Sequence, residues 1–168
     1  SYSYDDRYFF TGSYRRDGAS VFGVNQKWGD FFAFGGAWRL SSEKFMSSIS
    51  YLEDLKLKVS WGKNGNQGLD PYGTLSTINN GASGGVRYEF GGSDIIYGLN
   101  QKALGNANLG WETTESWNTG FESAWLGSRL FVDLDLYFSK TTDQIFTRDI
   151  PVMTGFKNMK SSMGQVTN

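Results

Sequence analysis

Apolar and polar residues alternate along several segments of this chain, with the two-residue period of a β-strand. The clearest segment runs from Leu130 to Phe138, where every second residue is apolar and the intervening residues include Asp133 and Asp135. Because successive side chains of a strand point to opposite faces, this segment would present one apolar and one polar face. A second amphipathic segment, Trp111 to Trp125, precedes it across a short connection at residues 126–129. Together they predict an antiparallel hairpin.

The same period predicts further strands elsewhere in the chain. They are placed at residues 2–4, 8–16, 31–40 and 55–62, and another begins at residue 161. The connections alternate between short ones (5–7, 41–54 and 126–129) and long ones (17–30, 63–110 and 141–160). Strand-like pieces are expected at 72–78 and 86–90, and a helical turn at 43–46. The pattern therefore predicts about six to seven main strands.

Short turns on one side and long loops on the other are typical of outer-membrane β-barrels, whose strands point apolar residues outward and polar residues inward. Trp111 and Trp125 stand at the two ends of their segment, and such rings favour the headgroup level of a bilayer. We therefore expect an all-β fold, an antiparallel section of a transmembrane β-barrel with long extracellular loops. In this interpretation the apolar rows headed by Leu130, Phe121, Leu55 and Phe32 face hydrocarbon.

The hairpin also has a predicted register, in which aromatic and aliphatic residues meet across the two strands. It pairs Trp125 with Leu130, Phe121 with Leu134, Trp117 with Phe138, and Glu122 with Asp133. Two carboxylates opposite each other are costly in a dry core but tolerable along a water-filled or cation-lined interior. The register therefore favours a wet lumen.

Composition agrees with an all-β chain and excludes several functions. Aromatic residues make up 17% of the 168 residues and glycine occurs 22 times, which suits pleated surfaces and turns. Cys and His are both absent, which removes the usual zinc ligands, thiol nucleophiles and imidazole bases. A net charge of −1 argues against a nucleic-acid partner. No apolar run approaches the roughly 18 residues that a spanning helix needs.

The polar face contains charges that could be given a chemical role. Glu122, Asp133 and Asp135 resemble the carboxylate pairs of glycoside hydrolases, and a cation between Glu122 and Asp133 is an alternative. A polar barrel lining explains them better, because every barrel strand needs such residues. Lys56, Lys58 and Arg39 are then expected to balance these acids. We predict no catalytic residue, metal or cofactor.

Candidate ligand contacts lie in or beside the long connections. Aromatic rings there could stack on sugars, and the amides Asn64, Asn66 and Gln67 could bind a glycan, although a girdle position is favoured for Trp111 and turn geometry for the amides. The candidate aromatic residues are Trp28, Tyr72, Tyr88, Tyr97 and Trp111. The Gly-rich runs at 81–85 and 91–92 lack the Lys-Ser/Thr ending of a phosphate loop. The selected ligand-binding candidates are Trp28, Asn66, Gln67, Tyr72 and Trp111.

Multi-residue blocks along the whole chain, in order, resemble the SusC/RagA-like TonB-dependent outer-membrane transporters of Bacteroidota. The blocks are Tyr4-Asp5-Asp6-Arg7-Tyr8, Arg15-Arg16-Asp17-Gly18-Ala19-Ser20, Trp28-Gly29, Trp38-Arg39-Leu40-Ser41, Glu43-Lys44-Phe45-Met46, Leu52 to Lys58, Ser60-Trp61-Gly62, Gly65-Asn66-Gln67, Leu104-Gly105-Asn106, Leu109-Gly110-Trp111-Glu112-Thr113-Thr114-Glu115 and Met163-Gly164-Gln165-Val166-Thr167-Asn168.

The resemblance implies that residues 1–168 are a partial barrel domain from the C-terminal half of a larger protein, without its plug domain and chain ends. It further implies a 22-strand barrel in the outer membrane, in contact with membrane lipid. Family members import oligosaccharides or peptides captured by a SusD-like surface lipoprotein, and the TonB complex drives transport through segments absent here. The function implied for this chain is barrel wall and extracellular loops, not enzymatic chemistry.

Two alternatives remain open from the residues alone. A soluble secreted β-sandwich, such as a carbohydrate-binding module, would bury its apolar rows against a second sheet. A self-contained eight-strand barrel is compatible with the length of the chain. Whether the apolar rows are covered or exposed distinguishes the sandwich from a barrel section. The number of strands and the closure of the sheet distinguish a complete eight-strand barrel from a barrel section.

Overall fold

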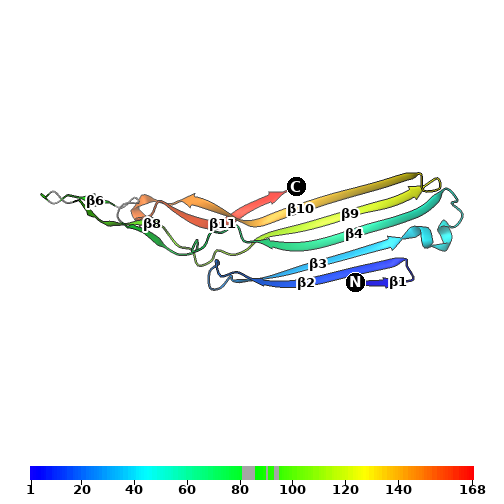
Figure 1. The fold of residues 1–168 in the computed structure, drawn as a ribbon, viewed down its shortest axis with the longest axis horizontal. Coiled ribbons are helices and arrows are strands. Elements are labelled where there is room, and N and C mark those ends of the chain that lie inside the picture. Colours follow the sequence, from blue (N-terminus) through cyan, green and yellow to red (C-terminus); the bar gives the residue numbers. More distant parts are fainter. Residues whose placement is uncertain (81–85, 90, 93–94) are drawn as a thin grey trace.

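A computed structural model shows one antiparallel sheet of seven strands with no second sheet packed on it among the described residues, which are 1–80, 86–89, 91–92 and 95–168. The strands follow the order β1-β2-β3-β4-β9-β10-β11, so each pairs with its neighbour in the sheet (Figure 1). Their bounds are β1 Tyr2–Tyr4, β2 Tyr8–Gly18, β3 Trp28–Arg39, β4 Leu52–Asn66, β9 Glu112–Trp125, β10 Leu130–Asp149 and β11 Asn158–Thr167. The predicted strand number and all-β class are confirmed.

The connections after β1, β3 and β9 lie at one end of the sheet, the short-turn end, and those after β2, β4 and β10, which include the long excursion at 67–111, lie at the other, the long-loop end (Figure 1). The short end has the turn after β1, the 3-10 turns η1 (Leu40–Ser42) and η2 (Lys44–Met46), and the β9–β10 turn. In that last turn Leu126, Gly127 and Ser128 all have positive φ, at 56°, 70° and 59°. The predicted helical turn at residues 43–46 is confirmed by η2. The long excursion lies at one end of the sheet, as in a barrel section, although the β3–β4 connection (40–51) is longer than the β2–β3 (19–27) and β10–β11 (150–157) connections.

Two predicted loops are wrong in extent. Residues 141–160 were expected to be a loop, but β10 continues to Asp149 and pairs with β11 from Lys140 opposite Thr167 to Asp149 opposite Asn158. Only a short turn with the 3-10 segment η4 (Val152–Thr154) connects them. The ends of the predicted 17–30 loop are likewise strand, since Gly18 pairs with Trp28. Backbone hydrogen bonds extend these strands where side-chain alternation no longer marks them.

The long excursion between β4 and β9 contains a narrow arm of short strands (Figure 1). β5 (Thr77–Asn80) pairs with β8 (Leu99–Ala103), and β6 (Arg87–Tyr88) pairs with β7 (Ile96–Tyr97). The strand-like pieces predicted at 72–78 and 86–90 therefore correspond in part to β5 and β6, and residues 72–76 form turns instead. The Gly-rich run at 81–85 lies outside the described residues.

The predicted hairpin register is confirmed at every stated pair. Trp125 lies opposite Leu130, and the remaining predicted pairs follow in the ladder between β9 and β10. On the other side of β9, Phe121 pairs with Leu57 and Trp117 with Trp61 of β4, so the apolar row continues into the next strand. Cross-strand aromatic and aliphatic neighbours of this kind stabilise the sheet.

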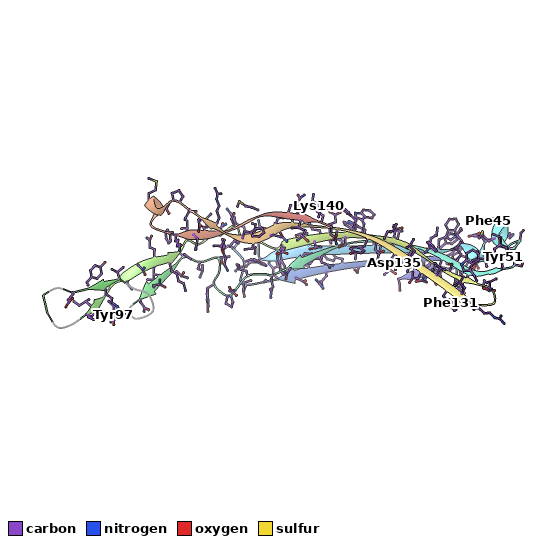
Figure 2. The ribbon with its side chains drawn as sticks, turned by 90° about the horizontal axis from the view of Figure 1, so that it is seen from above. Phe45, Tyr51, Tyr97, Phe131, Asp135 and Lys140 are labelled. Carbon is purple, nitrogen blue, oxygen red and sulfur yellow. The ribbon has the colours of Figure 1, made fainter. Side chains whose placement is uncertain are left out.

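Side chains project from both faces of the sheet into open space (Figure 2). On the apolar face Leu134 is 48% exposed and Leu136 61% exposed. The buried apolar residues gather instead at the long-loop end, in a cluster of Ala19, Phe22, Leu69 and Leu109. This result contradicts the sandwich alternative, in which the apolar rows would be covered. Among the described residues, no helix is both long and apolar enough to traverse a bilayer.

Candidate functional site

The apolar face of the sheet has the height of a bilayer core. On β10 the row from Leu130 to Phe138 spans eight residue steps, which is about 27 Å along a strand and about 21 Å after a tilt of about 40°, close to the ~25 Å apolar band of outer-membrane barrels. Two residues beyond its upper limit the same face carries Lys63, Glu115 and Lys140, which pair with one another across β4, β9 and β10. The apolar band is thus bounded by charge on the long-loop side.

Aromatic residues at both limits of this band direct their polar atoms to carboxylates. On the short-turn side Tyr8 Oη and Trp38 Nε1 donate hydrogen bonds to Glu43 Oε1 at 2.8 and 3.1 Å. On the long-loop side Trp61 Nε1 donates to Glu115 Oε1 at 2.7 Å, and Tyr14 Oη donates to Asp30 Oδ1 at 2.7 Å. Rings with an apolar body and a bonded polar tip are suited to the two bilayer interfaces.

One carboxylate of this group lies in the η1–η2 connection, outside the strands. The hydrogen bond from Tyr8, followed by the hydrogen bond from Trp38, lowers the pKa of Glu43 below its ordinary value of 4.5. Arg7 adds to this effect with its Nη1 at 3.7 Å from Glu43 Oε2. Glu43 therefore keeps its charge at neutral pH and fixes two interface rings at once.

The opposite face carries a compact charge network. Lys58 Nζ lies 2.9 Å from Glu122 Oε1, 3.2 Å from Asp133 Oδ1 and 3.4 Å from the Asp135 carboxylate. Lys56 Nζ is 3.8 Å from Glu122. The position considered for a bound cation, between Glu122 and Asp133, is therefore occupied by the ammonium group of Lys58. Arg39 Nε lies 3.4 Å from Asp54, so all three basic residues balance acids as expected.

Part of this inner face, around Gly35 and Ser60, is shallow because the side chains there are small. Two hollows of about 430 and 360 Å³ lie over it, and both are lined by Gly35, Ser60 and Asn118. Ala33 pairs with Gly62 in the same region, again without bulky groups. This region of small and charged side chains can remain in water or contact a polar body inside a barrel.

A third element of the site is a cavity among the long loops. It has a volume of about 520 Å³ and lies between the β2–β3 loop and the loop after β4, with Phe22, Lys27 and Tyr72 among its lining residues. Thr74 Oγ1 donates to the Val21 carbonyl at 3.3 Å, and the Gly23 amide donates to the Leu109 carbonyl at 3.3 Å. These bonds join the two loops around the cavity.

The five candidate ligand residues do not converge on one place. Tyr72, 74% exposed, lines the loop cavity, whereas Trp28, Asn66 and Gln67 are exposed at strand ends and do not line it. Trp28 lies under the Arg16 guanidinium, whose Cζ is 5.3 Å from the ring centroid.

Trp111 occupies a different position from the favoured one. Its ring packs on Phe22 at 4.9 Å and on Phe31 at 5.5 Å between centroids, next to the buried loop cluster. Phe31 directly precedes Phe32 on β3, so its side chain lies on the face of the sheet opposite to the apolar band. The girdle assignment for Trp111 is therefore wrong, because aromatic packing at the loop base holds the ring. Its Nε1 is buried and has no acceptor among the described residues.

Sequence reasoning missed the residues that build the loop end. Phe22, Leu69 and Leu109 are 2%, 8% and 0% exposed, respectively. Each lies in a loop segment without regular alternation of apolar and polar residues, so no periodic signal marked it. The available signal was the presence of large apolar residues in these polar loops, because leaving each of them exposed to water would be unfavourable.

Comparison with known proteins places these features in one family. Residues 1–168 match the family described as TonB dependent receptor-like, beta-barrel. A TonB-dependent receptor, P39, of Formosa agariphila is 36% identical over 99% of this chain. The TonB-dependent receptor SusC of Bacteroides thetaiotaomicron is 35% identical over 100% of this chain. The chain spans only 15% and 17% of those two relatives.

Solved structures agree with the sequence relatives. The RagAB peptide importer in its open-open state superimposes with a TM-score of 0.82 at 25% identity, covering 98% of this chain and 17% of the neighbour. The closed-closed state of the same importer gives a TM-score of 0.80 at 26% identity. The seven-stranded sheet is thus similar to one section of a much longer chain.

Proposed function

Because this chain belongs to the TonB-dependent receptor-like β-barrel family, we propose that it forms wall and extracellular loops of an outer-membrane importer of large nutrients. The observation that carries the proposal is the two-sided sheet. Its apolar face is about as tall as a bilayer core and bounded by bonded aromatic rings, while its other face holds the Lys58 network. In this role the short turns face the periplasm and the long loops the exterior.

The substrate proposed is an oligosaccharide or a peptide, delivered by a SusD-like surface lipoprotein. Support comes from two relatives, a receptor named SusC and a structure named the RagAB peptide importer. The remainder of the parent chain would supply the plug and the contact with TonB. The residues described here would act by wall, shape and loop contacts rather than by bond-breaking chemistry.

Within this function we assign Tyr72 to ligand contact at the loop cavity. Its ring is 74% exposed, and Lys27 lines the same cavity as a possible partner for polar or anionic groups. Trp28, Asn66 and Gln67 are proposed to act as outer contacts around the loop base, and Trp111, whose ring packs on Phe22 and Phe31, is proposed to support that base from inside. Exposed aromatic rings beside polar groups are suited to stacking on sugars or on peptide side chains.

Membrane embedding is tested by adjacent residues on opposite faces of β10. Leu136 lies in the apolar row and is 61% exposed, whereas Tyr137 points to the other face and is 70% exposed. In the intact transporter, Leu136→Arg should reduce folded protein in the outer membrane, since an arginine facing lipid costs about 2–4 kcal/mol near the midplane. Tyr137→Arg is the matched control and should assemble normally. Equal assembly of both variants would contradict the proposal.

Substrate class is tested by growth and uptake. A strain lacking the parent gene should lose growth on its oligosaccharide or peptide source, and the wild-type gene should restore it. The Tyr72→Ala variant should assemble in the membrane yet take up the substrate more slowly, with Tyr51→Ala in the short-turn region as the control. Unchanged uptake by Tyr72→Ala would remove this residue from the proposed contact.

A further inference from the structure

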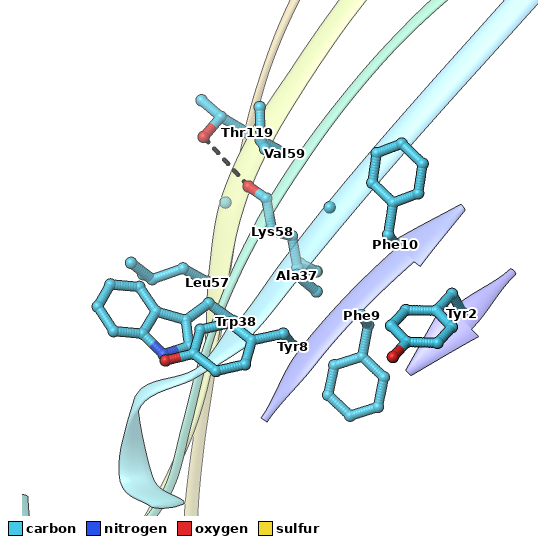
Figure 3. A pocket seen from close by; sticks show the side chains of 12 residues that line it. Tyr2, Tyr8, Phe9, Phe10, Ala37, Trp38, Leu57, Lys58, Val59 and Thr119 are labelled. Carbon is cyan, nitrogen blue, oxygen red and sulfur yellow. Dashed lines mark hydrogen bonds between the residues drawn. The ribbon is translucent and has the colours of Figure 1, made fainter. Parts of the chain in front are cut away.

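A groove crosses the apolar face of the sheet near the middle of the band. Its floor consists of Gly36, Val59 and Thr119, which are paired in turn across β3, β4 and β9. Two cavities of about 560 and 340 Å³ open over this floor, and both are lined by Phe10, Gly36 and Val59. Figure 3 shows the side chains around the larger one.

The groove has a higher wall on the long-loop side than on the short-turn side. Two residues along each strand toward the long loops stand Phe34, Trp61 and Trp117, whose rings form a row with centroids 6.0 and 6.2 Å apart. Toward the short turns stand Trp38, stacked on Tyr8 at 6.1 Å, and then the smaller Leu57. The groove is therefore lowest over Leu57, on the short-turn side.

Its surface is apolar even where a polar residue contributes. Thr119 Oγ1 donates a hydrogen bond to the Lys58 carbonyl at 3.2 Å, the bond drawn in Figure 3. The hydroxyl is thus satisfied by backbone and requires no water. Leu57 and Val59 are 40% and 49% exposed and offer only methyl groups.

Gly36 creates the space without being required by the backbone. A Cβ at this position would lie 3.8 Å from Val59 Cγ1 and 3.9 Å from the Phe9 carbonyl oxygen, which is ordinary contact. Its φ is not in the left-handed region, since Gly36 is not among the residues with positive φ. Glycine inside a strand weakens it, and such a glycine often marks close approach by another molecule.

We propose that this groove binds one acyl chain of a phospholipid from the membrane leaflet on the short-turn side. The groove is continuous with the apolar band that faces the bilayer, and its low side at Leu57 opens toward that leaflet. The aromatic row of Phe34, Trp61 and Trp117 would close the groove on the long-loop side and stop the end of the chain there. This inference rests on the proposed membrane embedding of the sheet.

The test uses the intact transporter reconstituted in vesicles of phosphatidylethanolamine with a small fraction carrying a photoreactive diazirine at the end of one acyl chain. After illumination, labelled positions are mapped by peptide mass spectrometry. Wild-type protein should be labelled preferentially at Phe10, Val59 and Trp61. The Gly36→Leu variant, which fills the groove floor, should lose this preference.

Gly12→Leu is the matched control. Gly12 lies on the same apolar face, outside the lining of both cavities, and a Cβ there would meet Phe34 Cδ1 at an ordinary 3.5 Å. This variant should keep the wild-type labelling pattern. Uniform labelling along the apolar face, or a pattern unchanged by Gly36→Leu, would overturn the groove while leaving membrane embedding intact.

Two further outcomes are separable. Absence of lipid labelling from the whole apolar face, including Leu134 and Leu136, would overturn the membrane embedding itself. A second copy of the chain as occupant would appear as a disulfide between Gly36→Cys subunits together with protection of Val59 from the lipid probe, and that result would also overturn the lipid proposal.

Discussion

The ammonium group of Lys58 on β4 donates a hydrogen bond to Glu122 on β9 at 2.9 Å, between two strands that are adjacent in the sheet although the long excursion separates them in sequence. The same ammonium group reaches Asp133 and Asp135 on β10. One cation therefore joins three strands on the inner face, and its removal would leave three carboxylates facing one another.

We expect Lys58→Met to lower the unfolding temperature of the intact transporter, because the remaining carboxylates repel one another. Added salt should restore part of the loss, since it screens partly exposed charges. Lys56→Met is the control and should cost less, because among the described carboxylates Lys56 pairs with Glu122 alone, at 3.8 Å. Thermal unfolding in detergent at low and high ionic strength measures both. A melting temperature of Lys58→Met equal to that of wild type would refute the expectation.

The second prediction concerns pH and Glu43. Since hydrogen bonds from Tyr8 and Trp38 lower its pKa below 4.5, the charged form is favoured in the folded protein. Its stabilisation is present above that ordinary value and is lost as the pH falls through the lowered folded pKa. Glu43→Gln should therefore unfold earlier than wild type at pH 7, and the difference should vanish in acid. The exposed turn variant Asp6→Asn should show no such pH-dependent difference.

The third prediction concerns the β9–β10 turn. Glu53 accepts hydrogen bonds from the backbone amides of Gly127 and Ser128, the latter at 3.2 Å, where the backbone has positive φ. Glu53→Ala should destabilise the hairpin by about 1.5–3 kcal/mol, the range for hydrogen bonds to a charged group. Glu53→Gln keeps one acceptor oxygen and should cost less. Equilibrium unfolding in urea compares the two, and equal costs would contradict a hydrogen-bonding role.

The fourth prediction concerns the loop core. Leu109 is fully buried, whereas Leu99 on β8 is 65% exposed. Leu109→Ala should cost about 2–5 kcal/mol and loosen the loops, as large-to-small changes in cores do. Leu99→Ala should have little effect. Limited proteolysis of the intact transporter should detect faster cleavage in the long loops of the first variant only, and the same cleavage rate in both would argue against a packed loop core.

The membrane-spanning hairpin could be predicted from sequence because two solvents act on its two faces. Leu134 and Asp135 are adjacent in the chain but face oil and water, so alternation fixes both the strand and its register with Phe121 and Gly120. Beyond Lys140 this contrast ends, yet β10 continues to Asp149. Backbone pairing with β11 extends the strand there, and it leaves no side-chain pattern to predict from.

The loop end could not be predicted because its contacts are non-local. Phe22 and Trp111 are far apart in the chain and meet at 4.9 Å, and Leu109 is buried only when the β2–β3 loop and the two ends of the β4–β9 excursion come together. For the same reason Tyr72 could be proposed as a ligand contact, but its placement on the cavity wall beside Lys27 could not. The alternation of apolar and polar residues along a strand contains no information on contacts between segments that are distant in sequence.

The hydrogen-bonded tryptophan rings at both limits of the apolar band affect how the sheet fits a bilayer of a given thickness. Trp38 is tied to Glu43 at one interface and Trp61 to Glu115 at the other, so neither ring can follow a shifting water boundary without breaking a hydrogen bond. When bilayer thickness differs from the height of the wall, the mismatch must be met by stretching or compressing the surrounding lipid. A bilayer around this sheet would therefore adapt its thickness to the fixed spacing of the two sets of hydrogen-bonded rings.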